Sequence, residues 1–437
     1  MKPAVPLPEE FPQNIRASLL LVFGAVLVGG ATGFIGVAFL RALDFGNQLR
    51  TSTVGSLENW PPGLGVALFA ISAGACAAFA TWLVLRFSPH AAGSGIPYVE
   101  KILRGPGEPD HRFVLPVKFL GGFVALSSGL VLGREGPLVQ MGAVIGDRIG
   151  RFFKGVENAW KPLMAAGAGA GVATAFNAPV GGTIFILEEV LKKATPLSFA
   201  LTAAAAVSSA CVQRGIFGMG PDYTVPFALP GPVENIWLYA LLGIALGILG
   251  AAYNRLLLGL AAPSSPLKKI SALPRAFAIG AVVGTAGWFL PDDFTGGDSL
   301  TQQILSSPAT AGLLLAVALA RFFTGPLSYA AGTPGGLFAP IVALGALLGS
   351  AGGSALHALQ PDLAPSPAAF AVAGMAAFFT ATIRAPLTGI VICLEMTGCY
   401  QLFLPMLAAC LGSHVSSAML RAEPIYDALA AQAVPKV

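Results

Sequence analysis

The sequence carries little charge, and this scarcity excludes an ordinary soluble domain. Charged residues make up only 11% of the chain and hydrophobic residues 55%, whereas soluble domains carry about 25% charged residues. The net charge is +4 over 437 residues. Basic residues fall in short connections, such as Lys192 with Lys193 and Lys268 with Lys269, where they bear on membrane topology. We therefore expect no nucleic-acid partner.

Residues that bind metals or catalyse reactions are also scarce. The four histidines form no HExxH motif, and the five cysteines show no metal-binding spacing. Most of the cysteines lie in apolar segments, where they are expected to act as small buried side chains. No pairing of a nucleophile with a base stands out beyond isolated Ser and His. We therefore expect no metal, no cofactor and no enzymatic activity.

Long apolar runs are present instead. A helix that spans a bilayer needs about 20 apolar residues, and such runs lie at residues 17–43, 63–85, 237–261, 275–290 and 312–323. The runs are continuous and lack the alternation of barrel strands, so the pattern favours an all-α integral membrane protein. Residues 1–13 are polar and Pro-rich, and we expect no cleaved signal peptide there.

Glycine and proline are unusually abundant within these apolar segments. The chain has 54 Gly and 34 Pro, many of them in the middle of hydrophobic stretches. Small residues allow membrane helices to pack closely, and this accounts for most of the glycines. The remainder, with the prolines, predict tilted and broken helices whose freed backbone groups line a site or are buried in protein.

The second half of the chain repeats the first. Lys118-Phe119, followed by a Gly-x-x-x-Pro pattern that starts at Gly133, recurs 203 residues later as Arg321-Phe322 and a pattern that starts at Gly336. Further on, Glu188 recurs 207 residues later as Glu395. Repeats of this length are typical of transporters with a site near the membrane midplane. We predict one membrane domain over residues 1–437, with repeats at about 60–215 and about 274–425 and no cytoplasmic regulatory domain after them.

Glu135 lies in the first repeated pattern, Gly133-Arg134-Glu135-Gly136-Pro137. Because Pro137 favours the first turn of a helix, Glu135 is predicted to lie at or just before a helix N-terminus. An ionisable group at membrane depth is costly and usually serves an ion or proton pathway. The second pattern has Phe338 and Ala339 before its proline, so the amides of Leu337 and Phe338 can hold an anion near Glu135.

A third glycine-rich helix start is Gly93-Ser94-Gly95-Ile96-Pro97. Ser94 can cap the helix with its hydroxyl, or it can donate that hydroxyl to an anion. In order and spacing the three motifs resemble the signature motifs of the CLC chloride channel and transporter family. The resemblance covers nearly the whole chain, from the first apolar segment to Tyr426.

The resemblance implies roles for particular residues. A dehydrated chloride would be held by the hydroxyl of Ser94, by a tyrosine hydroxyl from the last membrane helix, here Tyr426, and by the amides of Leu337 and Phe338. Relatives that prefer nitrate or fluoride differ at the serine position, so Ser94 with Tyr426 is similar to a chloride site. Glu135 would be the gate, which occupies an anion site when ionised. For Tyr426 the alternative is an aromatic at the membrane interface.

The family contains antiporters and passive channels, and Glu189 bears on the choice. It matches the glutamate that passes protons from the cytoplasmic side in the antiporters, whereas channels usually have an apolar residue there. We therefore expect a proton-coupled chloride antiporter, with a passive chloride channel as the alternative. Glu188 and Glu189 can instead cap a helix end or pair with Lys192 and Lys193.

Two further basic residues are secondary candidates. Lys118 and Arg134 can attract anions without binding them, or can simply pair with carboxylates. The resemblance also implies many tilted helices in two inverted repeats, assembled as a homodimer. We expect a multi-pass protein of the bacterial inner membrane that lies in the lipid bilayer and exchanges chloride and protons.

Overall fold

The computed structural model is built from helices connected by short loops. It describes residues 10–432 apart from 62, 106–108, 110, 154–155, 157, 227–228, 291–293, 308 and 365. Most of the N-terminal segment for which no cleaved signal was predicted lies outside these residues. Within them, eight helices are long and apolar enough to cross a membrane. Each of the five predicted apolar runs lies largely within a helix, which confirms the all-α membrane class.

The helices fall into two corresponding sets along the chain. The first set is α1 (Ile15–Leu57), α2 (Leu64–Phe87), α3 (Ile96–Arg104), α4 (Val114–Ser127), α5 (Glu135–Phe152), α6 (Trp160–Phe176), α7 (Pro179–Phe185) and α8 (Pro196–Phe217). The second set is α9 (Ile236–Ala261), α10 (Ala272–Phe289), α11 (Asp298–Ser306), α12 (Ala311–Ala330), α13 (Phe338–Leu359), α14 (Pro367–Ile383), α15 (Pro386–Thr397) and α16 (Phe403–Met419). A short helix, α17 (Ile425–Gln432), follows.

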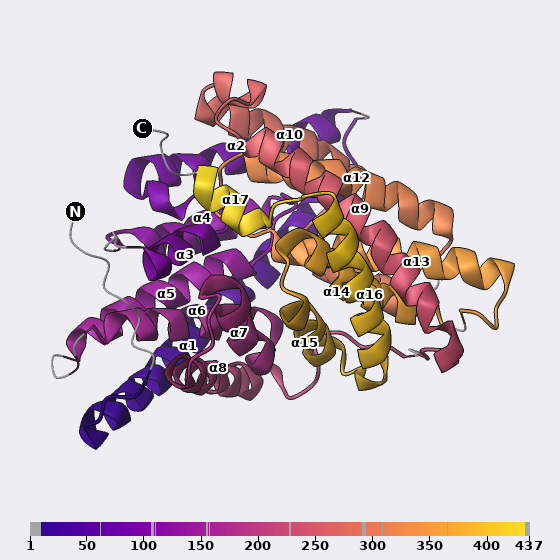
Figure 1. Ribbon diagram of the computed structural model, residues 1–437. Coiled ribbons are helices and arrows are strands. Elements are labelled where there is room, and N and C mark those ends of the chain that lie inside the picture. Colours follow the sequence, from indigo (N-terminus) through magenta and orange to yellow (C-terminus); the bar gives the residue numbers. More distant parts are fainter. Residues whose placement is uncertain are drawn as a thin grey trace.

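The two sets pack in the same way. Helix α5 packs on α6 as α13 packs on α14, and α6 contacts α7 as α14 contacts α15. The correspondence includes the helices that precede each predicted repeat, because α1 contacts α6 and α8 as α9 contacts α14 and α16. In Figure 1 most of the first set lies on one side of the molecule and most of the second on the other, with α2 and α10 against each other.

Glycines allow the repeated helix pairs to approach closely. A Cβ on Gly142 of α5 would lie 2.1 Å from the carbonyl oxygen of Gly167 in α6. The corresponding Gly345 of α13 would place its Cβ 2.4 Å from the carbonyl oxygen of Gly374 in α14. Both distances are well inside van der Waals contact. Close helix packing therefore explains these glycines, as predicted for most of them.

Several helices are short or interrupted. The helices α6 and α14 both end at a residue in the left-handed conformation, Asn177 with φ 49° and Arg384 with φ 73°. Helix α7 continues into a five-residue π-helical segment, η2 (Ile186–Val190), and α12 contains Pro326. These breaks fit the prediction of broken helices and place backbone groups inside the protein.

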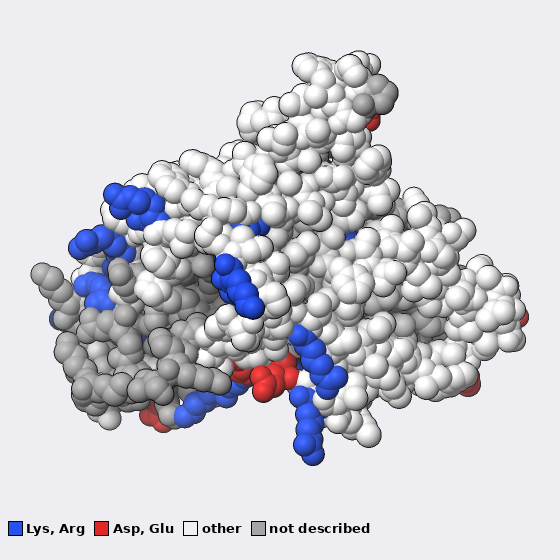
Figure 2. Space-filling model, turned by 90° about the horizontal axis from the view of Figure 1, so that it is seen from above, with Lys and Arg blue, Asp and Glu red and all other residues white. Residues whose placement is uncertain are grey.

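The molecular surface is dominated by uncharged residues. On the face shown in Figure 2, Lys and Arg side chains stand apart on a largely uncharged surface, and an acidic group lies between basic side chains. Many large apolar side chains are exposed on the long helices, such as Phe34 on α1 and Leu319 on α12. Exposed apolar side chains on long helices are expected for a protein surrounded by lipid.

Candidate functional site

The three predicted helix starts meet in the interior of the protein. Gly133 and Gly336 exchange two backbone hydrogen bonds, of 2.8 and 2.7 Å. The Gly93 amide donates to Thr333 at 3.1 Å, and its carbonyl accepts from the Gly335 amide at 3.0 Å. A Cβ on Gly136 would lie 2.8 Å from the Cα of Ser94 and 2.9 Å from the Cα of Gly336. Segments more than 200 residues apart are thus brought into direct contact.

Glu135 occupies the centre of this meeting point. It is the first residue of α5, as predicted, and it is 1% exposed. Its Oε1 accepts a hydrogen bond of 2.6 Å from the backbone amide of Phe338, the first residue of α13. The amide of Ala339 also faces the carboxylate. Within the described part of the chain, Oε2 has no hydrogen-bond partner.

Two glycines make room for this carboxylate. A Cβ on Gly133 or on Gly336 would lie 2.1 Å from an oxygen of Glu135. Any larger residue at either position would therefore displace the side chain. The carboxylate lies where the start of α13 offers backbone donors and a positive dipole end, which is a favourable place for any anion.

Aromatic side chains fix the start of α13. The ring of Phe338 lies 4.3 Å, centroid to centroid, from Phe176 of α6 and also 4.3 Å from Phe379 of α14. Leu337, the residue before the helix, is fully buried. The amide that holds Glu135 is thus positioned by helices from both repeats.

Two buried hydroxyls face the same region. Ser94 is fully buried, and from the position before the N-cap, Gly95, its Oγ accepts a 3.2 Å hydrogen bond from Ile96, so it does satisfy the first amide of α3. Tyr426 is also fully buried, which excludes the interfacial alternative, and its ring packs edge-on against Phe185. Among the described residues the Tyr426 hydroxyl has no hydrogen-bond partner. An unpaired hydroxyl in the interior is costly and is suited to a ligand.

The location of Tyr426 differs from the prediction in one respect. It lies on α17, which has eight residues and follows the last long helix, α16. A helix of that length cannot span a bilayer, which takes about 20 residues. The tyrosine reaches the interior because α17 packs against α3, near which it lies in Figure 1.

Lys118 supports the loop that carries Ser94. Its buried Nζ donates to the carbonyl oxygens of Ala91 at 3.0 Å and Gly93 at 2.5 Å. Gln140 of α5 adds a 2.8 Å hydrogen bond to the carbonyl of His90 in the same loop. Lys118 thus holds the first helix start in place through its backbone.

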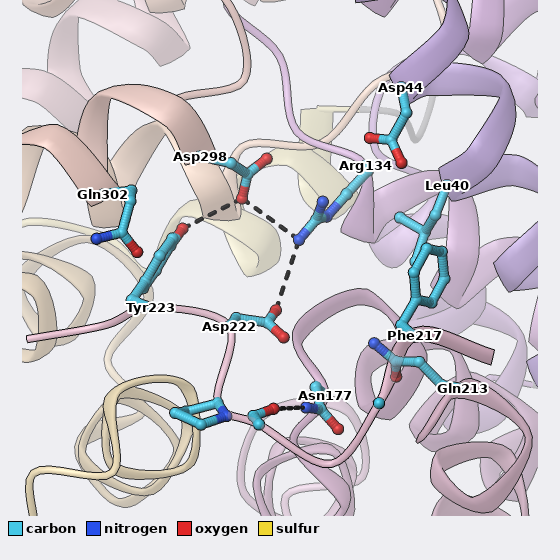
Figure 3. Close-up of a pocket in the computed structure, with 13 residues that line it drawn as sticks. Leu40, Asp44, Arg134, Asn177, Gln213, Phe217, Asp222, Tyr223, Asp298 and Gln302 are labelled. Carbon is cyan, nitrogen blue, oxygen red and sulfur yellow. Dashed lines mark hydrogen bonds and ion pairs between the residues drawn. The ribbon is translucent and has the colours of Figure 1, made fainter. Parts of the chain in front are cut away.

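Arg134 pairs with acidic residues, which was one of the two alternatives for it. Its Nη2 lies 3.4 Å from Asp298 and 3.6 Å from Asp222, and its Nε donates to the carbonyl of Ala175. Figure 3 shows these carboxylates around the guanidinium, with Tyr223 donating to Asp298. The cavity they line, with Asp44 nearby, has a volume of about 360 Å³.

Sequence reasoning missed Tyr329, Asp222 and Asp298. Tyr329, near the end of α12, has a hydroxyl that would lie 2.7 Å from a Cβ on Gly93 and that contacts Ser94. No motif contains it. No motif contains Asp222 or Asp298 either.

Glu188 caps a helix of the other repeat. Its carboxylate accepts from the amides of Leu387 at 3.1 Å and Thr388 at 2.7 Å, at the start of α15. Its counterpart Glu395 accepts from the amides of Val180 at 3.2 Å and Gly181 at 2.7 Å, at the start of α7. The expected alternative of a pair with Lys192 is wrong for Glu188, because Lys192 forms its ion pair with Asp427.

Glu189 lies in η2 and is 2% exposed. Among the described residues its Oε1 has no hydrogen-bond partner. It does not touch Glu135, but the Tyr426 hydroxyl interacts electrostatically with both glutamates. Glu100, which is also buried, interacts with the same hydroxyl. No cluster of three or more potential metal ligands occurs in the part of the chain that the structure describes.

The long apolar helices, the two repeats and the buried meeting of their helix starts define a repeat-built membrane transport protein. The profile of the family described as Voltage gated chloride channel matches residues 73–418. The chain is 37% identical to the H(+)/Cl(-) exchange transporter ClcA of Salmonella agona, over 97% of this chain and 91% of that protein. The chain belongs to this voltage gated chloride channel (CLC) family, as the motifs predicted.

Solved structures agree with this assignment. A slow cyanobacterial Cl-/H+ antiporter superposes with a TM-score of 0.90 at 32% identity, over 95% of this chain and 98% of that one. A CLC-type fluoride/proton antiporter gives a TM-score of 0.75 at 21% identity, over 95% and 99% of the two chains. The second likeness concerns the fold alone.

The reciprocal caps predict matched losses of stability. Replacing Glu188 by Ala, or Glu395 by Ala, leaves two amides without acceptors and should lower the free energy of unfolding by about 1–2 kcal/mol each. Thermal unfolding of the purified protein in detergent measures the effect. Glu234→Ala, at an exposed position in the short helix Val233–Asn235, is the control. Equal midpoints for Glu188→Ala and this control would show that the cap contributes nothing.

Proposed function

We propose that the protein exchanges chloride for protons across the membrane, through a central anion site gated by Glu135. The named relatives are H(+)/Cl(-) exchange and Cl-/H+ antiport proteins. The observation that carries the proposal is the carboxylate of Glu135 held by the Phe338 amide at a buried helix start. A carboxylate in that position is a bound anion that belongs to the protein itself.

The anion site consists of hydrogen-bond donors without basic side chains. Chloride would be held by the hydroxyls of Ser94 and Tyr426 and by the amides of Leu337 and Phe338. Two observations support this assignment: all four residues are buried, and the Tyr426 hydroxyl has no hydrogen-bond partner among the described residues. Neutral donors suit an exchanger because they bind an anion without trapping it as a formal ion pair would.

Glu135 couples the two ions by competition. Its carboxylate and a chloride carry the same charge, so they cannot occupy the same amide donors together. When Glu135 takes up a proton, it loses its negative charge and its hold on the Phe338 amide weakens. A chloride can then take its place, and each exchange of occupant moves a proton in one direction and a chloride in the other.

Glu189 would pass protons between Glu135 and the solution on the cytoplasmic side. With Glu135 and Glu100 it is one of three buried glutamates that interact electrostatically with Tyr426, and its Oε1 is unpaired in the described structure. A buried carboxylate without an ion pair can take up and release a proton at low electrostatic cost to its neighbours. A passive channel needs no such group, which favours antiport.

The bacterial relative and the apolar helices support a multi-pass protein of a bacterial cell membrane. We also propose a homodimer, as the family resemblance implies. Mass measurement of the protein in lipid nanodiscs should then give two chains of 44.5 kDa each. A single chain per particle at all concentrations would contradict the dimer.

Neutralising the gate should separate the two ions. In Glu135→Gln the side chain keeps its shape but carries no charge and no exchangeable acidic proton. Proton uptake by proteoliposomes driven by a chloride gradient should fall to background, while chloride efflux persists. Proton uptake at the wild-type rate in this variant would refute the role of Glu135.

Removing Glu189 should uncouple proton movement from chloride movement, as removing the charge of Glu135 should. In Glu189→Ala we expect chloride efflux to persist while proton uptake is lost, because no buried carboxylate replaces it. The neighbouring Glu188→Ala is the control and should keep the ratio of proton to chloride flux. If Glu189→Ala vesicles still move protons against their gradient, the relay lies elsewhere.

A further inference from the structure

Arg104 links three of the segments that carry or adjoin the proposed pathway groups: α3, η2 and α17. It is the last residue of α3, the helix that begins beside Ser94. It contacts the η2 segment that carries Glu189 and the α17 helix that carries Tyr426. The sequence motifs do not include Arg104, and the proposed exchange mechanism does not use it.

The contacts of Arg104 with η2 are made to the backbone. Its Nε donates to the carbonyl of Val190 at 2.7 Å, and its Nη2 donates to the carbonyl of Glu189. These carbonyls lie at the end of a helical segment, where a cation is favourable. Glu189 is therefore held through its main chain, while its carboxylate oxygen Oε1 has no hydrogen-bond partner in the described structure.

The other contacts of Arg104 are with two carboxylates. Its Nη1 lies 2.5 Å from Glu100, one turn back on α3, and 3.1 Å from Asp427 on α17. Asp427 directly follows Tyr426 in the chain and also binds Lys192, just after η2. The position of Tyr426 is thus tied to the position of Glu189 through one planar guanidinium.

The charges of this cluster explain why the main-chain attachment matters. Glu100, Glu189 and Asp427 supply three carboxylates, and Arg104 and Lys192 supply two cations. Both cations are engaged by Glu100 and Asp427. The remaining carboxylate, that of Glu189, forms no ion pair among the described residues, although both cations interact with it electrostatically, and it stays able to exchange a proton.

We propose that Arg104 is a positioning residue that couples the proton path to the anion path by fixing Glu189 relative to Tyr426. Only a guanidinium has enough donors in one plane to hold two carbonyls and two carboxylates together. Lysine at this position would keep the charge and lose the fixed geometry. The inference rests on the proposed function, because it assigns Arg104 a part in that exchange.

The test measures proton and chloride fluxes from the same proteoliposomes. In Arg104→Gln the ratio of proton to chloride flux should fall by about threefold or more, since small misplacements of reacting groups have large effects on rate. Arg104→Lys should restore little of the ratio. Arg151→Gln is the matched control, because Arg151 also pairs with a carboxylate four residues before it but contacts none of these segments.

Several results would overturn the proposal. A purely structural role would lower both fluxes together and leave their ratio unchanged. Full rescue by Arg104→Lys would show that only the charge matters.

Chloride binding measured by isothermal titration shows whether Arg104→Gln is folded. If it is not, Asp427→Ala decides, since it removes the acceptor that links Arg104 to α17 and keeps the two carbonyl contacts. An unchanged ratio in that variant contradicts the proposal.

The same measurements distinguish a failure of the proposed exchange function from a failure of the role of Arg104. Wild-type vesicles without coupled proton movement would refute the exchange mechanism and this inference with it. If the wild type couples and Glu189→Ala uncouples, but Arg104→Gln keeps the wild-type ratio, then only the role of Arg104 is wrong.

Discussion

The rest of the site depends on one hydrogen bond, from the Phe338 amide to the carboxylate of Glu135. It joins the start of a helix in one repeat to the side chain that begins the corresponding helix in the other. The bond places a negative charge inside an apolar protein, and backbone donors stabilise that buried charge. Glycine at positions 133 and 336 leaves the space that the carboxylate occupies.

The surrounding residues serve that arrangement by fixing main-chain positions. Lys118 binds carbonyls in the loop before Ser94, and Arg104 binds carbonyls in the segment of Glu189. Aromatic rings pack around Phe338 from both repeats. In each case a cation or a ring positions the backbone, while the Tyr426 hydroxyl and one oxygen each of Glu135 and Glu189 have no hydrogen-bond partner among the described residues. Such preorganised polar groups need little rearrangement when the occupant changes.

Much of the site was visible in the sequence because its signals are local. A proline after a glycine predicts a helix start within a few residues, and the repeat shows where the second start corresponds to the first. Glu135, Ser94 and the start at Phe338 were found in this way. Arg104, Tyr329, Asp222 and Asp298 were not, because their importance comes only from contacts between segments far apart in the chain. A single arginine at a helix end resembles any other basic residue near a loop.

The reciprocal pairing of Glu188 with α15 and of Glu395 with α7 bears on how the chain reaches its final state during synthesis. Neither short helix has an acceptor of its own for these first amides, because each is supplied by the opposite half. The amides of Val180 and Gly181 must wait for Glu395, which lies 215 residues beyond Val180. At a translation rate of roughly 5–20 residues per second, that delay is about 10–40 s. Until then the first amides of α7 lack their acceptor, and a chaperone or the insertion machinery has that interval in which to protect the N-terminal half.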